Sequence, residues 1–554
     1  MRRYQGIAVA LLAALAAAGC GETKQPAGAP PGSTGADGAA AATSAASASG
    51  EAAPSGNAPT DATFTYANGN NIVTDFDPAT SYSNEVIALN NVYEQLTRYD
   101  AETKTVKPLL ADSWTSTADG KSWTFRLHPG VTFHTGKPVT AAAAKAAIER
   151  TIKLKGGAAY IWDAVETIQA PDDATLTFKL KYAAPIDLIS SSTYAAFIYD
   201  TTAAGDGDLK KWFGQAKDAG TGPYVVGAWK KGDQNELRLE QFPDYWRGWE
   251  GAHYKHVLFQ YVPEETTRRQ LLDSGQASMA DRLSPQLFAE AKDQGRLATA
   301  ERPSFQNLIA FLNTSHGPLK DVRVRQAVSK AIDYEGIVAV LKGSAVPASG
   351  LIPEGLLGYK EGLAQAKDLD AAKTLMGQAG YGEGKRAKLL LTISNGDADQ
   401  RVVATLLKSN LAEIGIDVTV QPLEWQTQWD KAKSTDPTKR QDIFVMYWWP
   451  DYADPFSWFV NLFKSADPPF FNVSYLVDPA IDKQIDALPS LTATDREAAQ
   501  ASYEAIQTRL LEQAVAVPLY VVNYQRVLQK NVSGYVDNPA YANVAFVYDL
   551  TPTG

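Results

Sequence analysis

The sequence predicts an α/β protein with more than one domain, in which an α+β first half precedes a second half with parallel strands. Three observations lead to this fold class. The chain has 554 residues, 45% of them hydrophobic and 21% charged, which is typical of a globular protein too long for one ordinary domain. Its first half has short alternating strands between turn signals. Its second half contains a strand, a helix and a strand in that order.

The first residues have the pattern of an export signal. Arg2 and Arg3 precede an apolar run from Ile7 to Ala18, which is too short to span a membrane and ends in small residues before Cys20. The pattern resembles the bacterial lipoprotein signal, in which residues 1–19 are removed and the cysteine is acylated, although Ala17 stands where that signal usually has leucine. The alternative is a plain secretory signal with a chance cysteine. Because Cys20 is the single cysteine, we expect lipidation there.

Residues 20–60 are almost entirely Ala, Gly, Ser, Pro and Thr. Such a segment cannot bury enough apolar surface to offset its conformational entropy, so it predicts a disordered tether. A flexible chain of this length has a root-mean-square reach of roughly 35 Å. We therefore expect a folded body tethered outside a bacterial membrane.

The next segments predict antiparallel sheet and helix. Lys121 to Phe133 alternates like a strand until the turn pair Pro129-Gly130, and Ala174 to Tyr182 alternates similarly. Between them, Val139 to Arg150 is an Ala-rich helix with Thr140 as its expected N-cap. This half is therefore predicted to be α+β.

The second half predicts a parallel βαβ unit. Leu319 to Leu341 has helical apolar spacing, and Asp368 to Gly380 runs from an acidic cap to a glycine stop. Leu389 to Ser394 and Ile416 to Val420 are strands on either side of a helix, and Asp442 to Trp448 is a further apolar strand.

Two strand ends are candidates for a ligand crevice, because open α/β sheets bind ligands beyond the carboxyl ends of their strands. The loop Asn395 to Asp399 follows one strand, and Asp451 follows another. Asp454, directly before Pro455, is expected to begin a helix instead.

Aromatic residues surround Asp451. The stretch Met446 to Phe463 holds eight aromatics in eighteen positions, including Tyr447, Trp448 and Trp449. A carboxylate among aromatic rings is costly to desolvate unless it meets a cation, and aromatic faces also attract cations. Strand alternation predicts that one of the two adjacent indoles faces the core and the other faces the crevice. The pattern predicts a pocket for a ligand that carries an ammonium group.

The chain resembles the peptide and nickel class of extracytoplasmic solute-binding proteins, which supply ABC importers. The resemblance rests on collinear motifs that include "NNVYEQLTRYD", "DGKSWTFRLHPGVTFHTGKPVTA", "GTGPYVV", "PLKDVRVRQAVSKAID", "LAEIGIDV" and "AVPLYVVNYQR". It implies a two-lobed, type II periplasmic-binding-protein-like fold with an extra α+β domain in the first lobe. The implied boundaries are 61–95 and 206–300 for lobe I, 96–205 for the extra domain, 301–512 for lobe II, and 513–554 for a return to lobe I.

The resemblance also implies roles for particular residues. In the family's peptide binders, an acid in the segment that is "WWPDYADP" here pairs with the α-amino group of the ligand, and the corresponding acid is Asp451. Trp448 corresponds to a position that lines the pocket. Where some members carry a base for the ligand carboxylate, this chain has Val445, which leaves Arg401 as the candidate. Apart from the resemblance, Asn307 is expected to line the same cleft, because its strand leads into the second lobe.

We interpret the chain as a substrate-binding lipoprotein of an ABC importer. It is expected to capture peptides or similar amino-bearing solutes and to deliver them to permease subunits. The expected location is the periplasm or the cell surface, as a monomer anchored to the membrane through Cys20. The net charge of −10 and the lack of a dense basic tract argue against nucleic acid as a partner, and no cofactor or metal is expected.

Three alternatives remain open. The same transport role could serve a metal chelate, a sugar or an opine. A glycan-acting enzyme would need two carboxylates roughly 5 to 9.5 Å apart in the cleft. A metal site could use His253 and His256 if both lay on one face of a helix, although two histidines make a thin site.

Overall fold

The computed structural model describes residues 61–553, apart from residues 70, 71, 73–75, 83, 233, 234, 282, 383, 396, 468 and 470. The predicted signal (1–19), the tether (20–60) and Cys20 lie outside the described residues. Within the described part, no helix is both long and apolar enough to cross a membrane.

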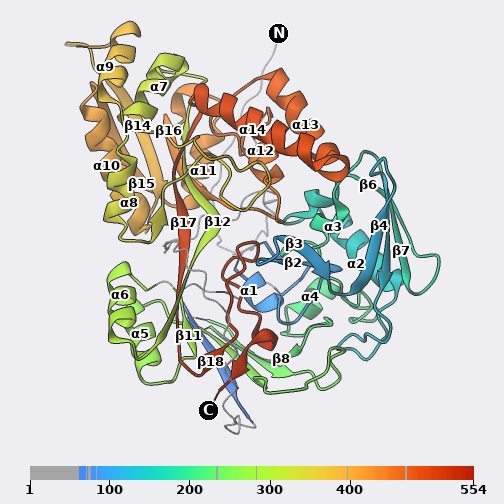
Figure 1. The fold of residues 1–554 in the computed structure, drawn as a ribbon. Coiled ribbons are helices and arrows are strands. Elements are labelled where there is room, and N and C mark those ends of the chain that lie inside the picture. The colour runs from blue at the N-terminus through green and yellow to red at the C-terminus, as the bar shows by residue number, and fades with distance from the viewer. Residues whose placement is uncertain are drawn as a thin grey trace, which may run out of the picture.

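One eleven-stranded sheet runs through both lobes (Figure 1). Its order is β15 (Ile416–Leu423), β14 (Ala387–Ser394), β16 (Ile443–Trp448), β12 (Ala298–Leu312), β17 (Ala516–Leu528), β11 (Met279–Ala280), β1 (Thr63–Asn68), β10 (His256–Tyr261), β9 (Glu236–Gln241) and β8 (Tyr224–Lys230), with β13 (Ala345–Val346) on β17.

The two long strands β12 and β17 connect the lobes. They pair antiparallel, and the register between them shifts between Pro303 and Asn307. On the lobe I side of this shift, the end of β17 also pairs with β11. On the lobe II side, residues 307–312 of β12 pair with β16. The strand pair is therefore the connection about which the lobes can move.

Lobe I combines the β11 to β8 part of the sheet with a separate antiparallel domain. The domain sheet has the order β4 (Ala111–Ser116), β5 (Ser122–Leu127), β7 (Thr175–Leu180) and β6 (Val165–Gln169), covered by α2 (Ala141–Leu154). A hairpin of β2 (Thr97–Asp100) and β3 (Thr105–Pro108) lies beside it, and β18 (Val532–Ser533) pairs with β19 (Thr551–Pro552) near the C-terminus. The remaining helices of lobe I are α1 (Val86–Leu89), η1 (Ala159–Trp162), α3 (Ile186–Ile189), α4 (Leu209–Phe213), α5 (Glu265–Asp273), α6 (Pro285–Gln294) and η4 (Val547–Asp549).

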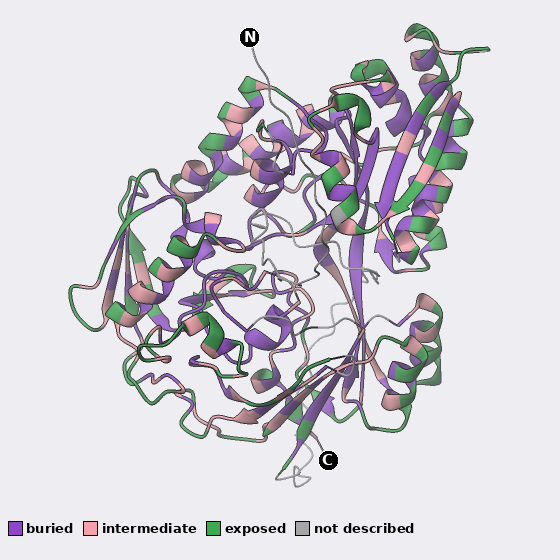
Figure 2. Cartoon of the chain, turned by 180° about the vertical axis from the view of Figure 1, so that it is seen from behind, coloured by how far each residue is buried: buried purple, intermediate pink, exposed green. Residues whose placement is uncertain are grey.

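Lobe II is a three-layer α/β structure. Along β16, Met446 and Trp448 pack into one core cluster with α12 to α14, whereas Val445 and Tyr447 pack into another with α7 to α10. This alternation buries β16 on both faces, whereas the edge strand β15 is partly exposed; Figure 2 shows buried strands in purple and exposed residues in green. The helices are η2 (Pro318–Lys320), α7 (Val322–Ala331), α8 (Tyr334–Val340), α9 (Leu369–Gln378), α10 (Ala398–Ala412), α11 (Trp425–Ala432), η3 (Pro437–Lys439), α12 (Phe456–Leu462), α13 (Pro479–Thr494) and α14 (Arg496–Glu512).

Most predicted elements are confirmed. Thr140 caps α2 by accepting from the backbone N–H of Ala143 at 3.2 Å. The strands β14 and β15 are parallel and joined by α10, as the βαβ pattern predicts. The α/β fold with two lobes and an extra α+β domain is thus confirmed.

The helical pattern from Leu319 to Leu341 does not form one helix. It is divided into α7 and α8, because Ile332 is extended and the Asp333 carboxylate accepts from the N–H of Gly336 at 2.9 Å. The apolar spacing continues across the break, but the N-cap restarts the helix.

Candidate functional site

Asp451 lies just past the carboxyl end of β16 and contacts residues of lobe I. Its Oδ1 accepts a hydrogen bond from the Tyr82 hydroxyl at 3.1 Å, and its Oδ2 accepts one from the Tyr160 hydroxyl. Its backbone carbonyl accepts from Ser192 Oγ at 2.6 Å. Only 1% of the residue is exposed. Asp451 is therefore held at the interface between the lobes.

The Asp451 carboxylate has no positive partner in the described part of the chain. Burial raises its pKa to about 6, and the hydrogen bonds from Tyr160 and Tyr82 oppose that shift only in part. Burial, together with the nearby Asp451 charge, also raises the pKa of both tyrosines. An incoming cation would supply the charge that this buried site lacks.

Aromatic rings from both lobes surround the carboxylate. The rings of Tyr82 and Tyr194, both in lobe I, meet edge to face with centroids 4.9 Å apart. Across the interface, the indole Nε1 of Trp449 in lobe II lies 3.4 Å from the Tyr194 hydroxyl and donates to it. The site thus pairs one acid with several aromatic faces, which is suited to an ammonium ligand.

The two residues before Trp449 point away from one another. Trp448 is 1% exposed, packs against Phe471 with centroids 5.4 Å apart and donates to Ser457 Oγ at 3.4 Å. The Tyr447 hydroxyl is 3.0 Å from that of Tyr520 on the opposite face. Both side chains are core residues of lobe II in this structure, and their contact with a ligand stays a prediction.

Asn307 and Arg401 lie in contrasting surroundings. Asn307 is fully buried, donates to the Leu351 carbonyl at 2.8 Å and accepts from Trp458 Nε1 at 3.1 Å, so its amide is used within lobe II. Arg401 is exposed near the start of α10 and makes no ion pair with the described residues. Arg401 therefore keeps its donors for another group, whereas Asn307 positions the core of the lobe.

Asp454 marks the start of α12, as the sequence predicts. Its Oδ1 accepts from the N–H of Phe456 at 2.8 Å and from the Tyr503 hydroxyl at 2.6 Å. The helix begins at Phe456, one residue later than the position expected from Pro455. Asp454 is therefore fixed within lobe II.

The possible histidine pair is not on a helix. His256 is the first residue of strand β10 and contacts Glu240 and Asp61, whereas His253 contacts the carbonyls of Tyr548 and Glu250. No group of three potential metal ligands occurs among the described residues. The helical arrangement considered for these two histidines is therefore wrong.

Sequence reasoning missed the lobe I half of the site. Tyr82, Tyr160, Tyr194 and Ser192 lie more than 250 residues before Asp451 along the chain, in segments without a motif that marks them as binding residues. After β14, Asp397 is the N-cap of α10 and Asp399 lies in the first turn of that helix, where burial and the charge of Asp397 raise the pKa of Asp399 to about 7. The segment Asn395 to Asp399 was expected as a loop at the crevice, but its last residues begin α10, and Asp399 was not singled out.

Comparison with known proteins identifies relatives of the whole folded body. The family model described as bacterial extracellular solute-binding proteins, family 5 Middle, matches residues 105–469. The probable D,D-dipeptide-binding periplasmic protein DdpA of Escherichia coli K12 is 30% identical over 492 residues, 84% of this chain and 90% of that protein. The di/tripeptide-binding protein 2 of Pseudomonas aeruginosa is 28% identical over 502 residues, 84% of this chain and 91% of that protein.

Solved structures show the same fold. NikA from Brucella suis, in complex with Fe(III)-EDTA, has a TM-score of 0.77 at 24% identity, over 89% of this chain and 100% of that chain. CtaP from Listeria monocytogenes has a TM-score of 0.78 at 22% identity, with the same coverage. The curated relatives are named for the solutes that they bind, which supports a role other than catalysis. This chain belongs to the family 5 bacterial extracellular solute-binding proteins.

Proposed function

We propose that this protein is the substrate-binding component of an ABC importer and that it captures a peptide, or a similar solute with a free amino group, between its lobes. The observation that carries the proposal is the buried Asp451 carboxylate, which faces lobe I and whose partners among the described residues are two tyrosine hydroxyls. The names of the curated relatives, a probable D,D-dipeptide binder and a di/tripeptide binder, support a peptide as the solute.

An ammonium group satisfies the site chemically. It donates up to three hydrogen bonds, supplies the missing positive charge and tolerates the faces of aromatic rings. Closure of the lobes excludes water, so the attraction between ammonium and carboxylate is stronger than it is in solvent. The Tyr82 and Tyr160 hydroxyls can keep donating to the carboxylate while the ligand approaches from another side.

Arg401 is the proposed partner for the ligand carboxylate. It is exposed, lies near the amino end of α10 and has unused guanidinium donors. Val445, at the position where some family members carry a base, is fully buried and cannot pair with an anion. Because an apolar residue stands at this position, a second candidate is the same transport role for an amine that is not a peptide.

We further propose that Cys20 carries a lipid and that the segment 20–60 tethers a monomeric body outside the membrane, where it delivers solute to the permease. The small-residue stretch before Cys20 and the composition of the tether support this arrangement. The lobe boundaries at 95/96, 205/206, 300/301 and 512/513 belong to the same proposal.

A thermal-shift screen of the full chain tests the solute class. The panel contains di- to pentapeptides, their N-acetylated forms, oligosaccharides and nickel chelates. A ligand at about 100 times its Kd stabilises the protein by about 2.7 kcal/mol if it binds only the folded state. We expect shifts with free peptides that disappear on N-acetylation. Equal shifts with both forms would contradict amino-group recognition, and shifts with a sugar or a chelate alone would overturn the peptide assignment.

A further inference from the structure

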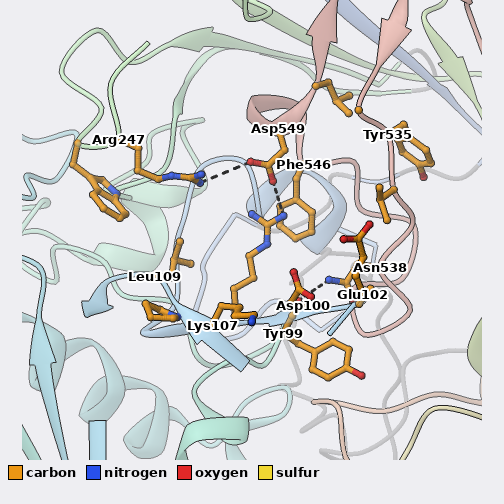
Figure 3. A pocket seen from close by; sticks show the side chains of 17 residues that line it. Tyr99, Asp100, Glu102, Lys107, Leu109, Arg247, Tyr535, Asn538, Phe546 and Asp549 are labelled. Atoms are coloured by element: carbon orange, nitrogen blue, oxygen red, sulfur yellow. Dashed lines mark hydrogen bonds and ion pairs between the residues drawn. The ribbon is translucent and has the colours of Figure 1, made fainter. Parts of the chain in front are cut away.

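A cavity of about 460 Å³ lies in lobe I, outside the interface that contains Asp451. Three separate segments form it: the β2–β3 hairpin, the residues Trp246 and Arg247 that follow β9, and the C-terminal segment from Gly534 to Leu550 (Figure 3). Neither its lining nor its ion pairs include a residue of lobe II. The cavity is therefore distinct from the proposed transport site.

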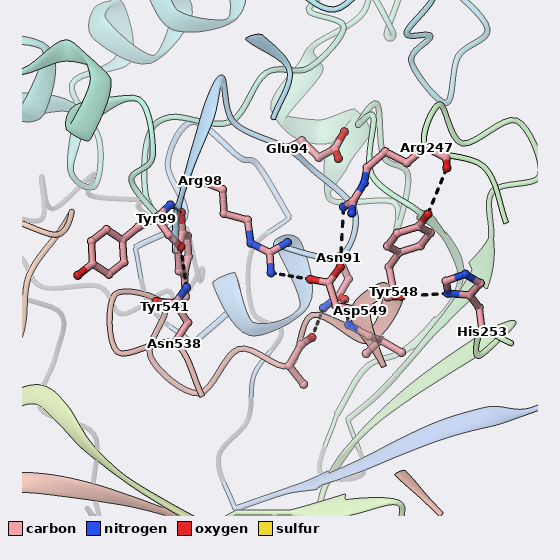
Figure 4. A network of polar contacts seen from close by, with 12 residues as sticks. Asn91, Glu94, Arg98, Tyr99, Arg247, His253, Asn538, Tyr541, Tyr548 and Asp549 are labelled. Carbon is pink, nitrogen blue, oxygen red and sulfur yellow. Dashed lines mark hydrogen bonds and ion pairs between the residues drawn. The ribbon is translucent and has the colours of Figure 1, made fainter. Parts of the chain in front are cut away.

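Two guanidinium groups converge on one carboxylate in this cavity (Figure 4). Arg98 Nη2 lies 2.7 Å from Asp549 Oδ2, and Arg247 Nη1 lies 3.8 Å from Asp549 Oδ1. The Arg98 guanidinium also stacks on Phe546, with Cζ 3.4 Å from the ring centroid. Asp549 thus pairs with both guanidiniums, and the positive charge of Arg247 also opposes the rise that burial causes in the pKa of the nearby Glu94 carboxyl.

The guanidinium of Arg98 has donors to spare. It carries five N–H groups, yet its side chain makes a single hydrogen bond to the described residues, to Asp549. Arg247 meets Asp549 at ion-pair distance rather than at hydrogen-bond distance. Its Cζ lies 4.8 Å from the Tyr548 ring centroid, which helps to hold it in place.

The other charges of the lining do not use these donors. The Asp100 carboxylate accepts from both the N–H and the hydroxyl of Thr103 at 2.7 Å, and these hydrogen bonds lower its pKa. Glu102 and Lys107 are both exposed and offset one another in charge. Over the whole lining, three basic residues balance three acidic ones, so what the two arginines offer is N–H donors without a hydrogen-bond partner rather than an excess of charge.

We propose that this cavity is a second ligand site, which binds a small carboxylate with an apolar body. Arginine binds carboxylates through parallel N–H donors, and both guanidiniums can contribute donors here. The rings of Tyr99, Trp246 and Phe546 line the same cavity and offer apolar surface to the rest of the ligand. This inference does not depend on the proposed transport function.

Isothermal titration of the full chain tests the site with benzoylglycine as the probe and its methyl ester as the neutral counterpart. We expect one acid molecule to bind per chain, with an affinity that falls as salt rises, and no measurable binding of the ester. Arg98→Gln and Arg247→Gln should each weaken binding by about tenfold or more. Arg98→Lys, which keeps the charge without the paired donors, should also weaken it.

A matched control variant distinguishes binding in this cavity from binding elsewhere on the protein. Arg238→Gln removes an exposed arginine of β9 that pairs with Glu240 outside the cavity, so it should leave the affinity for benzoylglycine unchanged. Ion pairs this exposed contribute little to stability, so all variants should fold, which thermal unfolding verifies. No heat of binding, equal binding of the ester, or equal losses in Arg238→Gln and Arg98→Gln would each overturn the proposal.

Discussion

The replacement Asp451→Asn tests the proposed binding chemistry directly, because it removes the charge and keeps the shape. The two carboxylate oxygens of Asp451 accept separately from Tyr82 and Tyr160. An asparagine can accept from one hydroxyl and donate to the other, so the network between the lobes can persist. The variant therefore loses the negative charge rather than the fold.

The expected effect on affinity is large. Leaving one partner of a buried ion pair without its counter-charge costs about 3–5 kcal/mol. Because the amide still accepts a hydrogen bond, we expect a loss of about 3 kcal/mol, roughly a hundredfold increase in Kd for a free peptide. The ligand-free variant should be at least as stable as the wild type at pH 8, since an uncompensated buried charge has been removed.

The pH dependence has a defined sign. The folded-state pKa of Asp451 is about 6, above the ordinary value of 3.8, so the folded protein binds more protons between these pH values. Its contribution to the free energy of unfolding is fully present below about pH 4 and is lost as pH rises through 6, about 3 kcal/mol in total. The affinity for an ammonium ligand changes in the opposite direction. It rises with pH up to about 6 and then stays constant until the α-amino group of the ligand itself loses its proton, at about pH 8.

Calorimetric titration with free and N-acetylated forms of one peptide, between pH 4.5 and 8, measures both effects. The wild type should lose up to tenfold in affinity per pH unit below about pH 6. The asparagine variant should bind weakly at every pH and show no such slope. Unchanged affinity in Asp451→Asn, or the same slope in both proteins, would refute ammonium recognition by this residue.

Other residues test separate features of the protein. Tyr541→Phe removes a hydroxyl that accepts from the backbone N–H of Tyr99 at 3.1 Å and donates to the carbonyl of Ser191 at 2.7 Å. Thermal unfolding should therefore show a loss of about 1–3 kcal/mol in the free energy of unfolding. The control Tyr182→Phe, at an exposed position, should show little change. Arg401→Gln should weaken the binding of peptides with a free C-terminal carboxylate, measured by calorimetry, and leave the binding of their C-terminal amides unchanged. Equal effects on both would exclude Arg401 as the partner of the ligand carboxylate. Cys20→Ser should abolish acylation, detected by mass spectrometry and membrane fractionation; membrane retention would contradict the proposed anchor.

The sequence predicts the elements of lobe II and the position of Asp451 well, because both follow from local rules. The apolar runs of β14 and β16 and the glycine stop at Gly415 need only neighbouring residues to be recognised. The position of Asp451 then follows from the rule that loops after parallel strands line the crevice.

The partners of Asp451 could not be predicted in the same way. Tyr82 and Tyr160 reach it only because the chain returns across the interface between the lobes, and no periodicity records that proximity. Trp448 shows a related limit: strand alternation separates it from Trp449, but only the packing of α12 to α14 decides which face is core. Long-range packing therefore determines half of the candidate site.

Asp451 and Asp454, three residues apart and both almost fully buried, show how position separates two chemically identical groups. The side-chain partners of Asp454, the N–H of Phe456 and the hydroxyl of Tyr503, belong to α12 and α14, so they stay in place if the lobes separate. The side-chain partners of Asp451 belong to lobe I and would be lost. If the lobes separate about β12 and β17, water therefore reaches the carboxylate of Asp451, whereas that of Asp454 stays buried. A cation that offsets the desolvation of Asp451 binds more tightly when the lobes are closed than when they are open. By thermodynamic linkage, it stabilises the closed arrangement by that same difference in binding free energy.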